Sequence, residues 1–432
     1  MARNMKDSGI EWIGEIPEGW RTINPKALFT QRKDKAQKGE RQLTSSQQYG
    51  ILYQDDYMEL TGSKVVTVEK DFDILKHVEA GDFVISMRSF QGGLEYSTKS
   101  GAISSAYVML VPNLEFVYPR FYRWLLKSSV YIDALQRTTN MVRDGQAMRY
   151  SNFAQVWLFT LPLDEQKSRA DFLDLECSSI DKILFKTRSS IEEYKKLKQA
   201  VITQAVTKGV RGEREMKDSG VEWIGKIPKE WDIIKSSRII KTTQNGLSRR
   251  DLEKSEGQII LKLKNITSDG KIDYSFLNRI TLSQNELNTY ALTTGDFLFV
   301  RVNGSKSLVG KCAIFEAISE IVAYNDHIIR VKLSNQCYNR FFLWYLYSCC
   351  GKAEIDLHTS TAAGQYTISG DGLRDITLVF PPIDEQKEIA DYLDAKCAEI
   401  DKLIAKKEQL VKELESYKKS LIYEVVTGKR EV

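Results

Sequence analysis

Two sequences that each occur twice constrain this chain of 432 residues more than any other feature. Block A reads MKDSGIEWIGEIP at residues 5–17 and MKDSGVEWIGKIP at residues 216–228. Block B reads LDEQKSRADFLDLECSSIDK at residues 163–182 and IDEQKEIADYLDAKCAEIDK at residues 383–402. Internal repeats indicate a structural unit that is used more than once. Each half of the chain therefore runs from block A through an intervening region to block B.

The intervening regions differ strongly between the two halves. A few matches survive in them: Gly81-Asp82-Phe83 with Gly295-Asp296-Phe297, Arg120-Phe121 and Trp124 with Arg340-Phe341 and Trp344, and Gly145-Gln146 with Gly364-Gln365. Gene duplication followed by uniform drift would not leave two blocks nearly identical and the sequence between them so different. The pattern favours a constant framework that carries two different domains.

Block B has the signals of a long helix. Neither proline nor glycine occurs between Asp164 and Gly209, or between Asp384 and Gly428. Aspartate is a good N-cap, Glu165 and Glu385 suit the positive end of a helix dipole, and glycine ends helices. We expect two helices, each about 65 Å long at about 1.5 Å per residue.

Apolar residues recur in both helices at alternating steps of four and three, which is the period of a coiled coil. Two such helices in one chain should pair with each other. We interpret Cys177 and Cys397, at equivalent seam positions, as small buried apolar residues without a redox role. The predicted seam comprises Leu173, Cys177, Ile180, Leu184, Thr187, Ile191, Tyr194, Lys198, Val201 and Ala205 in the first helix, and Leu393, Cys397, Ile400, Ile404, Lys407, Val411, Leu414, Lys418, Leu421 and Val425 in the second.

Residues 18–160 and 229–380 read as compact α+β domains. Short β-rich runs at 82–87, 296–302 and 321–333 alternate with Gly, Asn and Ser turns, and 120–128 and 340–348 predict short amphipathic helices. The loops that follow the Gly-Asp-Phe strands hold side chains that can contact base edges or phosphates. The candidate contacts to nucleic acid are Arg88, Ser89, Gln91, Arg301, Asn303, Ser305 and Lys306, with the basic pair Arg249 and Arg250.

Composition and motifs argue against catalysis in this chain. A net charge of +4, from 62 basic and 58 acidic residues, does not by itself indicate a nucleic-acid binder. The six cysteines and three histidines lack metal-ligand spacing, so we predict no metal site. GSKSLVGKC at 304–312 departs from a phosphate loop, and DEQK at 164–167 and 384–387 is better explained by a helix start than by a nuclease site. No long apolar run or signal core is present, and we expect a cytoplasmic protein without membrane contact.

The two blocks, MKDSGIEWIGEIPEGW with LPLDEQKSRADFLDLECSSIDK and their second copies, resemble the constant regions of type I restriction-modification specificity subunits. The terminal YKKSLIYEVVTGKREV is also similar to that family's C-terminal end, so the resemblance spans essentially the whole chain. It implies two target recognition domains, each reading one half of a bipartite double-stranded DNA site. The two long helices would pack antiparallel and fix the gap between the half-sites, and we expect a pseudo-twofold axis to relate the two halves.

The resemblance further implies partners and a division of the chain. Two modification subunits that bind S-adenosylmethionine would dock on the framework, and restriction subunits that use ATP and Mg²⁺ would join for cleavage. The chain itself would hold no cofactor and catalyse nothing. We expect target recognition domains at 1–160 and 211–380, and conserved helices at 161–210 and 381–432. TKGVRGEREMKDSG leads from the first helix into the second block A, so a cyclic order with neighbouring termini is expected.

Two other classes of function remain open. A stand-alone nuclease or methyltransferase would need catalytic motifs that we do not find. A coiled-coil scaffold that binds only proteins would not bind DNA in a salt-dependent manner.

Overall fold

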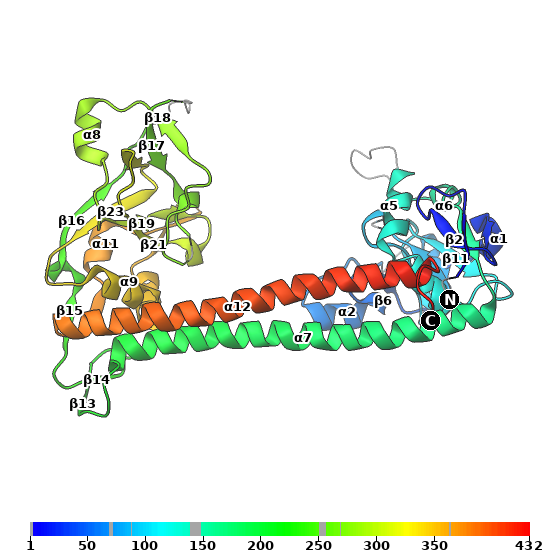
Figure 1. Cartoon of the computed structure of the whole chain (residues 1–432), viewed down its shortest axis with the longest axis horizontal. Coiled ribbons are helices and arrows are strands. Elements are labelled where there is room, and N and C mark those ends of the chain that lie inside the picture. Colours follow the sequence, from blue (N-terminus) through cyan, green and yellow to red (C-terminus); the bar gives the residue numbers. More distant parts are fainter. Residues whose placement is uncertain are drawn as a thin grey trace. The chain divides into compact units, whose positions relative to one another are not determined.

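The computed structural model describes residues 3–68, 72–87, 89–138, 148–249, 256–267, 269–362 and 364–432. The chain forms two units, each with one domain and parts of both long helices (Figure 1). Unit 1 comprises residues 1–188 and 408–432, and unit 2 comprises residues 189–407. Of the sequence matches noted above, Gly145-Gln146 lies outside the described residues.

Block A folds into the same hairpin in both units. Strands β1 (Met5–Asp7) and β2 (Glu15–Pro17) are antiparallel with Met5 opposite Pro17, and β13 (Met216–Asp218) and β14 (Lys226–Pro228) repeat this register. The Asp7 carboxylate accepts the Gly9 N–H at 2.9 Å, and Asp218 accepts that of Gly220 at the same distance. Gly9 and Gly220 have φ of 68° and 73°, a conformation that favours glycine. The turn geometry accounts for the repeated Asp-Ser-Gly.

The central sheets of the two domains also share one plan. In unit 1 the strand order is β4 (Phe29–Arg32), β11 (Val108–Pro112), β8 (Phe83–Ile85) and β9 (Glu95–Tyr96). In unit 2 it is β16 (Ile240–Asn245), β23 (Ile328–Leu333), β19 (Phe297–Val300) and β21 (Cys312–Ile314). All pairs are antiparallel. A second ladder joins β3 (Arg21–Ile23) to β12 (Leu158–Thr160), and β15 (Asp232–Lys235) to β26 (Thr377–Phe380).

The domains differ in what surrounds this common sheet. Unit 1 adds the pairs β5 (Leu43–Ser46) with β6 (Gly50–Tyr53) and β7 (Lys76–Val78) with β10 (Gly101–Ile103), and helix α2 (Gln54–Thr61). Unit 2 instead adds the sheet β18 (Asn278–Ile280), β17 (Gln258–Leu261), β22 (Val322–Tyr324), and the sheet β20 (Val302–Asn303), β25 (Gln365–Thr367), β24 (Ser360–Ala362). The remaining short helices are α1 (Pro25–Leu28), α3 (Ser89–Gly92), α5 (Ser129–Arg137) and α6 (Tyr150–Phe153) in unit 1, and α8 (Gln284–Tyr290), α10 (Cys349–Leu357) and α11 (Gly370–Arg374) in unit 2.

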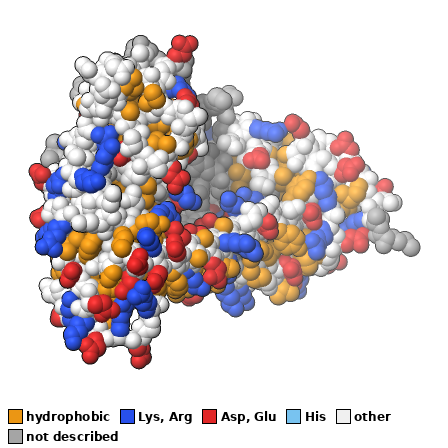
Figure 2. Space-filling model, turned by 60° about the vertical axis from the view of Figure 1, so that its left-hand side comes forward, with side chains coloured by type: hydrophobic (Ala, Val, Ile, Leu, Met, Phe, Trp, Pro, Cys, Tyr) orange, Lys and Arg blue, Asp and Glu red, His pale blue; other side chains and the backbone are white. Residues whose placement is uncertain are grey.

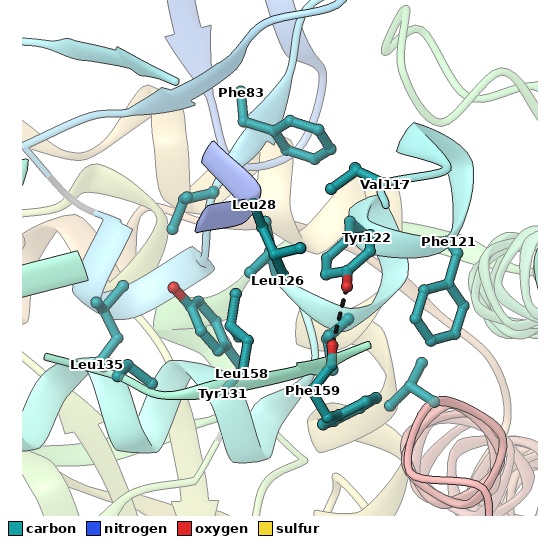
Figure 3. Close-up of a cluster of buried hydrophobic side chains, with 14 of the residues drawn as sticks. Leu28, Phe83, Val117, Phe121, Tyr122, Leu126, Tyr131, Leu135, Leu158 and Phe159 are labelled. Carbon is teal, nitrogen blue, oxygen red and sulfur yellow. Dashed lines mark hydrogen bonds between the residues drawn. The ribbon is translucent and has the colours of Figure 1, made fainter. Parts of the chain in front are cut away.

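The two expected amphipathic helices are present as α4 (Pro119–Leu125) and α9 (Asn339–Tyr347). In unit 1, Phe121, Tyr122 and Leu125 of α4 are buried against the sheet (Figure 3). The Tyr122 hydroxyl donates to the backbone carbonyl of Phe159 at 2.9 Å, so the buried polar group is satisfied. The expected α+β fold is confirmed.

Block B forms the start of each long helix, α7 (Leu163–Lys208) and α12 (Ile383–Val426). The predicted N-caps Asp164 and Asp384 are wrong, because the helices begin one residue earlier. The first hydrogen bonds run from Gln166 N–H to the Pro162 carbonyl and from Gln386 N–H to the Pro382 carbonyl. The two aspartates lie in the first turn, where a carboxylate still favours the helix dipole.

Within each unit the two helices are antiparallel. In unit 1 Asp181 pairs with Lys418 at 2.6 Å, and Arg188, farther along α7, pairs with Glu415, which is earlier in α12. In unit 2 Lys198 pairs with Asp401 at 2.6 Å, and Tyr194 lies under the ammonium of Lys407. The Asp181–Lys418 and Asp401–Lys198 pairs join equivalent positions of the repeat. The expected antiparallel pairing of the long helices is confirmed within each unit.

The seam positions lie in the cores of the two units. Leu173, Cys177, Ile180, Leu184 and Ile191 of α7 are at most 7% exposed, as are Leu393, Cys397 and Ile400 of α12. Ile404, Val411 and Leu414 are half-buried. The helices share one hydrophobic core with the domain of their unit, so burial of the domain and of the seam are coupled. Among the residues that the structure describes, no helix has the length and apolar character to cross a membrane.

Candidate nucleic-acid interface

The candidate residues of unit 1 follow strand β8. Arg88 lies outside the described residues. Ser89 begins α3, is 1% exposed, and its hydroxyl accepts the backbone N–H of Ser86 at 2.8 Å. Gln91, in the same short helix, is exposed. The Ser89 hydroxyl is therefore buried in this structure and its contact to nucleic acid stays a prediction, whereas the exposed Gln91 side chain is free of such burial.

The candidate residues of unit 2 follow β19 and lie along strand β20 and the turn after it. Arg301 is half-buried and donates to the Asp326 carbonyl at 3.1 Å. The Asn303 carboxamide oxygen accepts the Ser305 N–H at 2.9 Å and so shapes the turn. Ser305 and Lys306 are exposed, and the Lys306 ammonium lies 4.0 Å from Asp356. Exposed donors thus gather at this turn.

Strand pairing brings a further set of polar side chains to the same place. Asn303 lies opposite Tyr366 in β25, and β25 pairs with β24. Ser360, Thr361 and Gln365 of these strands are exposed. Sequence reasoning noted Gly364-Gln365 only as a match between the halves and did not propose Gln365 as a contact. The signal was the short Ser-Thr and Gln-Tyr-Thr runs around a glycine, which are typical of a hairpin.

The basic pair is the third candidate. Arg249 donates to both carboxylate oxygens of Glu286, at 2.9 and 3.1 Å, and Glu286 also caps helix α8 through Ser283. Arg250 lies outside the described residues. On the face that Figure 2 shows, Lys and Arg side chains are mixed with Asp and Glu. A mixed surface of this kind favours contacts by particular side chains over broad electrostatic attraction.

The repeated residues of block B have structural partners in block A. The indole N–H of Trp20 donates to Glu165 at 3.2 Å, and that of Trp231 donates to Glu385 at 3.2 Å. Both indoles are fully buried. Burial opposes ionisation of Glu165, but hydrogen bonds from Arg3 and Arg169 outweigh it and lower its pKa to about 2. The Trp-Glu contact ties the hairpin of block A to the start of a long helix in each unit.

The glutamine that follows Glu165 and Glu385 in block B connects each long helix to the domain of its unit through hydrogen bonds. Gln166 is fully buried; its carboxamide oxygen accepts the Tyr118 N–H at 2.7 Å, and its amide donates to the Phe116 and Leu161 carbonyls at 2.8 and 2.9 Å. Gln386 accepts the Tyr338 N–H at 2.8 Å and donates to the Pro381 carbonyl at 2.8 Å. This glutamine satisfies the backbone just before α4 and just before α9.

A carboxylate two helical turns farther along makes a second attachment. Asp174 accepts the Arg120 Nε–H at 2.9 Å and the Trp124 indole N–H at 2.8 Å. Asp394 accepts the same groups of Arg340 and Trp344 at 3.1 and 2.8 Å. The Arg and Trp matches inside the divergent regions are thus part of the framework.

Arg169 is a buried framework residue that has no arginine at the equivalent position of the other half. Arg169 is 1% exposed and donates to Glu165 and to the carbonyls of Val425 and Arg430, at 2.7, 2.8 and 2.9 Å. Its equivalent in block B of unit 2 is the buried Ile389. The guanidinium stacks over Trp20, with 5.0 Å to the ring centroid, where unit 2 has Arg214 over Trp231 at the same distance. Arg169 therefore joins the first and last segments of the described chain, and the expected proximity of the termini is confirmed within unit 1 (Figure 1).

The other motifs do not assemble a catalytic arrangement. Residues 304–312 lead into strand β21, whereas a phosphate loop leads into a helix. Within the described ranges, no group of three or more His, Cys, Asp or Glu side chains is placed to hold a metal ion. Burial raises the pKa of Cys177 and Cys397 to about 11 each, which disfavours the reactive thiolate.

Comparisons of sequence agree with this framework. The sequence model of a family described as "Type I restriction modification DNA specificity domain" matches residues 228–413. The chain is 24% identical to the type I restriction enzyme StySPI specificity subunit of Salmonella potsdam, over 96% of this chain and 90% of the relative. It is also 24% identical to the EcoKI specificity subunit of Escherichia coli strain K12, over 87% of this chain and 82% of the relative.

Solved structures share the fold. A chain from work on complex assembly and conformational transition of the type I R-M system superposes with a TM-score of 0.71 at 13% identity, covering 96% of this chain and 99% of the other. The HsdS subunit from Thermoanaerobacter tengcongensis gives a TM-score of 0.53 at 14% identity, covering 96% and 98%. These similarities show that the chain has the fold of these solved structures and that residues 228–413 match the type I restriction-modification DNA specificity domain.

Proposed function

We propose that this chain is the subunit that gives a type I restriction-modification complex its DNA sequence specificity. The domain of each unit would read one half of a bipartite double-stranded DNA site, and the paired helices would set the spacer between the half-sites. The observation that carries the proposal is that one framework occurs twice and holds two domains whose peripheral sheets differ. Two different DNA-reading domains on one framework suit a DNA site whose two halves differ in sequence.

The proposed DNA contacts are polar side chains in short helices, short strands and the turns beside them. They are Gln91 in unit 1, and Arg249, Asn303, Ser305, Lys306 and Gln365 in unit 2. Arg301 would contribute after release from the Asp326 carbonyl. Amide and guanidinium groups can make paired hydrogen bonds to base edges, and Ser and Lys can contact phosphates. Arg88 and Arg250 stay candidates from sequence.

The proposed partners follow from the same framework. Two modification subunits, holding S-adenosylmethionine, would bind the surfaces that the two units repeat, and restriction subunits that use ATP and Mg²⁺ would join for cleavage. We propose that this chain itself is not catalytic and acts by placing the partner enzymes on DNA. The division into recognition domains (1–160 and 211–380) and spacer helices (161–210 and 381–432) stays part of the proposal.

The test is to express the chain with its modification subunits in a host that lacks them, and to map methylated bases across the genome. We expect one bipartite sequence with a fixed spacer. Absence of methylation above the host background, with all subunits present and folded, would contradict the proposal. Methylation by the purified chain alone would instead favour the enzyme alternative.

A domain exchange tests whether each domain reads one half-site independently of the other domain. Replacing residues 18–160 with the equivalent region of another specificity subunit should change one half-site and leave the other half-site and the spacer as they were. A change in both half-sites would mean that the domains do not read independently. A gel-shift titration with the modification subunits present should show affinity falling steeply with salt, whereas a scaffold that binds only proteins would give no shift.

A further inference from the structure

Each domain is attached to its long helix at the same two places. The first is the glutamine of block B, Gln166 or Gln386, which holds the backbone before α4 or α9. The second is the aspartate, Asp174 or Asp394, which holds an arginine and a tryptophan of that short helix. Eight residues separate the two attachments along the helix, or about 12 Å at about 1.5 Å per residue. Two separated contacts prevent the pivoting that a single contact allows.

Stability alone does not explain the aspartate. The Arg120 and Asp174 side chains are 42% and 23% exposed, and those of Arg340 and Asp394 are 42% and 35% exposed. Ion pairs at such exposure contribute little to folding. Yet the Arg, Trp and Asp recur in both units, while much of the remaining sequence between blocks A and B differs. A contact that adds little stability and is nevertheless repeated points to a geometric role.

The geometry of the contact suits that role. In unit 1 the Asp174 carboxylate accepts N–H groups of Arg120, of Arg123 at 2.7 Å and of the Trp124 indole, which are directional donors from one short helix. A cleft of about 620 Å³ borders the contact in unit 1 and is lined by Trp124, Asp174, Cys177 and Phe185, among others. The cleft leaves one side of the contact open, so the hydrogen bonds to Asp174 add to the core packing of Phe121 and Leu125 in holding α4 at its angle to α7.

We propose that Asp174 and Asp394 are positioning residues that hold each DNA-reading domain at a fixed angle to its long helix, and so restrict the spacer length that the complex accepts. This role rests on the proposed function above. The aspartates do not touch DNA, and they act through Arg120 and Trp124 or through Arg340 and Trp344. The two attachments have different tasks: the buried glutamine anchors the domain, and the aspartate sets its orientation.

The test compares Asp174→Asn and Trp124→Phe with the wild type in the complex with modification subunits, by mapping methylated bases genome-wide. Asparagine keeps the size of the side chain but loses the charge and one acceptor, and phenylalanine loses only the indole donor among its polar groups. Sites with a spacer one base pair shorter or longer should be methylated about tenfold more than by the wild type. The base sequences of both half-sites should stay unchanged. Asp394→Asn should have the same effect through unit 2.

The matched control is Asp164→Asn, the same substitution at an exposed position of the same helix. It should keep the wild-type spacer distribution. An unchanged spacer distribution in Asp174→Asn and Trp124→Phe, with or without a lower melting temperature, would overturn the proposal, because a merely structural contact affects only the amount of folded protein. Altered half-site bases would also overturn it. Failure of the proposed function would appear already in the wild type, as the absence of any bipartite methylation.

Discussion

At the scale of residues, Arg169 shows how the two copies of the framework differ. In unit 2 the end of α7 continues into Arg211 and Arg214, which pair with Glu385. In unit 1 the corresponding place is filled by the end of α12, and there Arg169 binds the Val425 and Arg430 carbonyls and Glu165 together.

Replacing Arg169 should therefore destabilise unit 1. Arg169→Met removes a fully buried cation and leaves the Val425 and Arg430 carbonyls without this donor, which should cost about 3 kcal/mol. Lys167→Met, two residues away and exposed, should change stability by less than about 0.5 kcal/mol. Urea unfolding followed by circular dichroism measures both. Equal stability of the two variants would mean that Arg169 does not hold the chain ends.

The ionisation of Glu165 should make the stability of this cluster depend on pH. Its pKa is lowered to about 2, because hydrogen bonds from Arg3 and Arg169 outweigh the cost of burial. A lowered pKa stabilises the folded state fully above the unfolded-state value, about 4.5, and this stabilisation is lost as the pH falls toward 2. The melting temperature of the wild type should therefore drop more between pH 4.5 and 2.5 than that of Glu165→Gln. Parallel curves for the two proteins across this window would contradict the assignment.

At the scale of elements, the coiled-coil seam buries some residues of α7 and leaves their neighbours in the sequence exposed. Leu184 is 5% exposed in the core of unit 1, whereas Ile183 beside it is 48% exposed. Leu184→Ala should cost about 3 kcal/mol because it leaves a cavity, and Ile183→Ala should cost about 0.5 kcal/mol. Thermal unfolding of the two variants measures the difference. A similar loss in both would place the seam on another face of α7.

The helices and strands that could be predicted are those that a pattern of neighbouring residues in the sequence specifies. The steps of four and three in α7 and α12 and the glycines after them were sufficient to find both helices and to predict that they pair, whereas the antiparallel direction was implied by the family resemblance. The predicted N-caps were two residues too late, because the Pro162 and Pro382 carbonyls accept the first helical hydrogen bonds, whereas aspartate is the residue type with a high N-cap preference. The burial of Ser89 and the exposure of Gln365 depend on which strands pair, and such nonlocal contacts leave little trace in one sequence.

The framework contacts illustrate the same limit. Glu165 was assigned to the helix dipole from sequence, but in the structure it also receives the Trp20 indole N–H and two guanidinium groups. Gln166 was read only as part of a helix start, although it makes three hydrogen bonds to the domain and to the segment before α7. Periodicity predicts which face of a helix is buried, but it does not reveal the partner of a buried polar group.

At the scale of the whole molecule, lengthening the two long helices should change the DNA spacer between the half-sites without changing the bases that the domains recognise. Both helices pass from one unit to the other, α7 at residues 188–189 and α12 at residues 407–408. Insertion of seven residues at both points keeps the seam in phase, because seven residues are one coiled-coil repeat. Insertion of four residues at both points would shift the phase and disturb the seam.

We expect the double heptad insertion to change only the spacer. Seven residues add about 10.5 Å of helix, and three base pairs of DNA add about 10 Å. Because the same DNA turns by roughly 100° over three base pairs at about 10.5 base pairs per turn, the complex should either accept a spacer about three base pairs longer or lose binding. Methylation mapping distinguishes these outcomes, with the four-residue double insertion as the control for a disrupted seam. New half-site bases, or full activity on the original spacer, would contradict the role of the helices, because a spacer element cannot change what the domains read or be lengthened without effect.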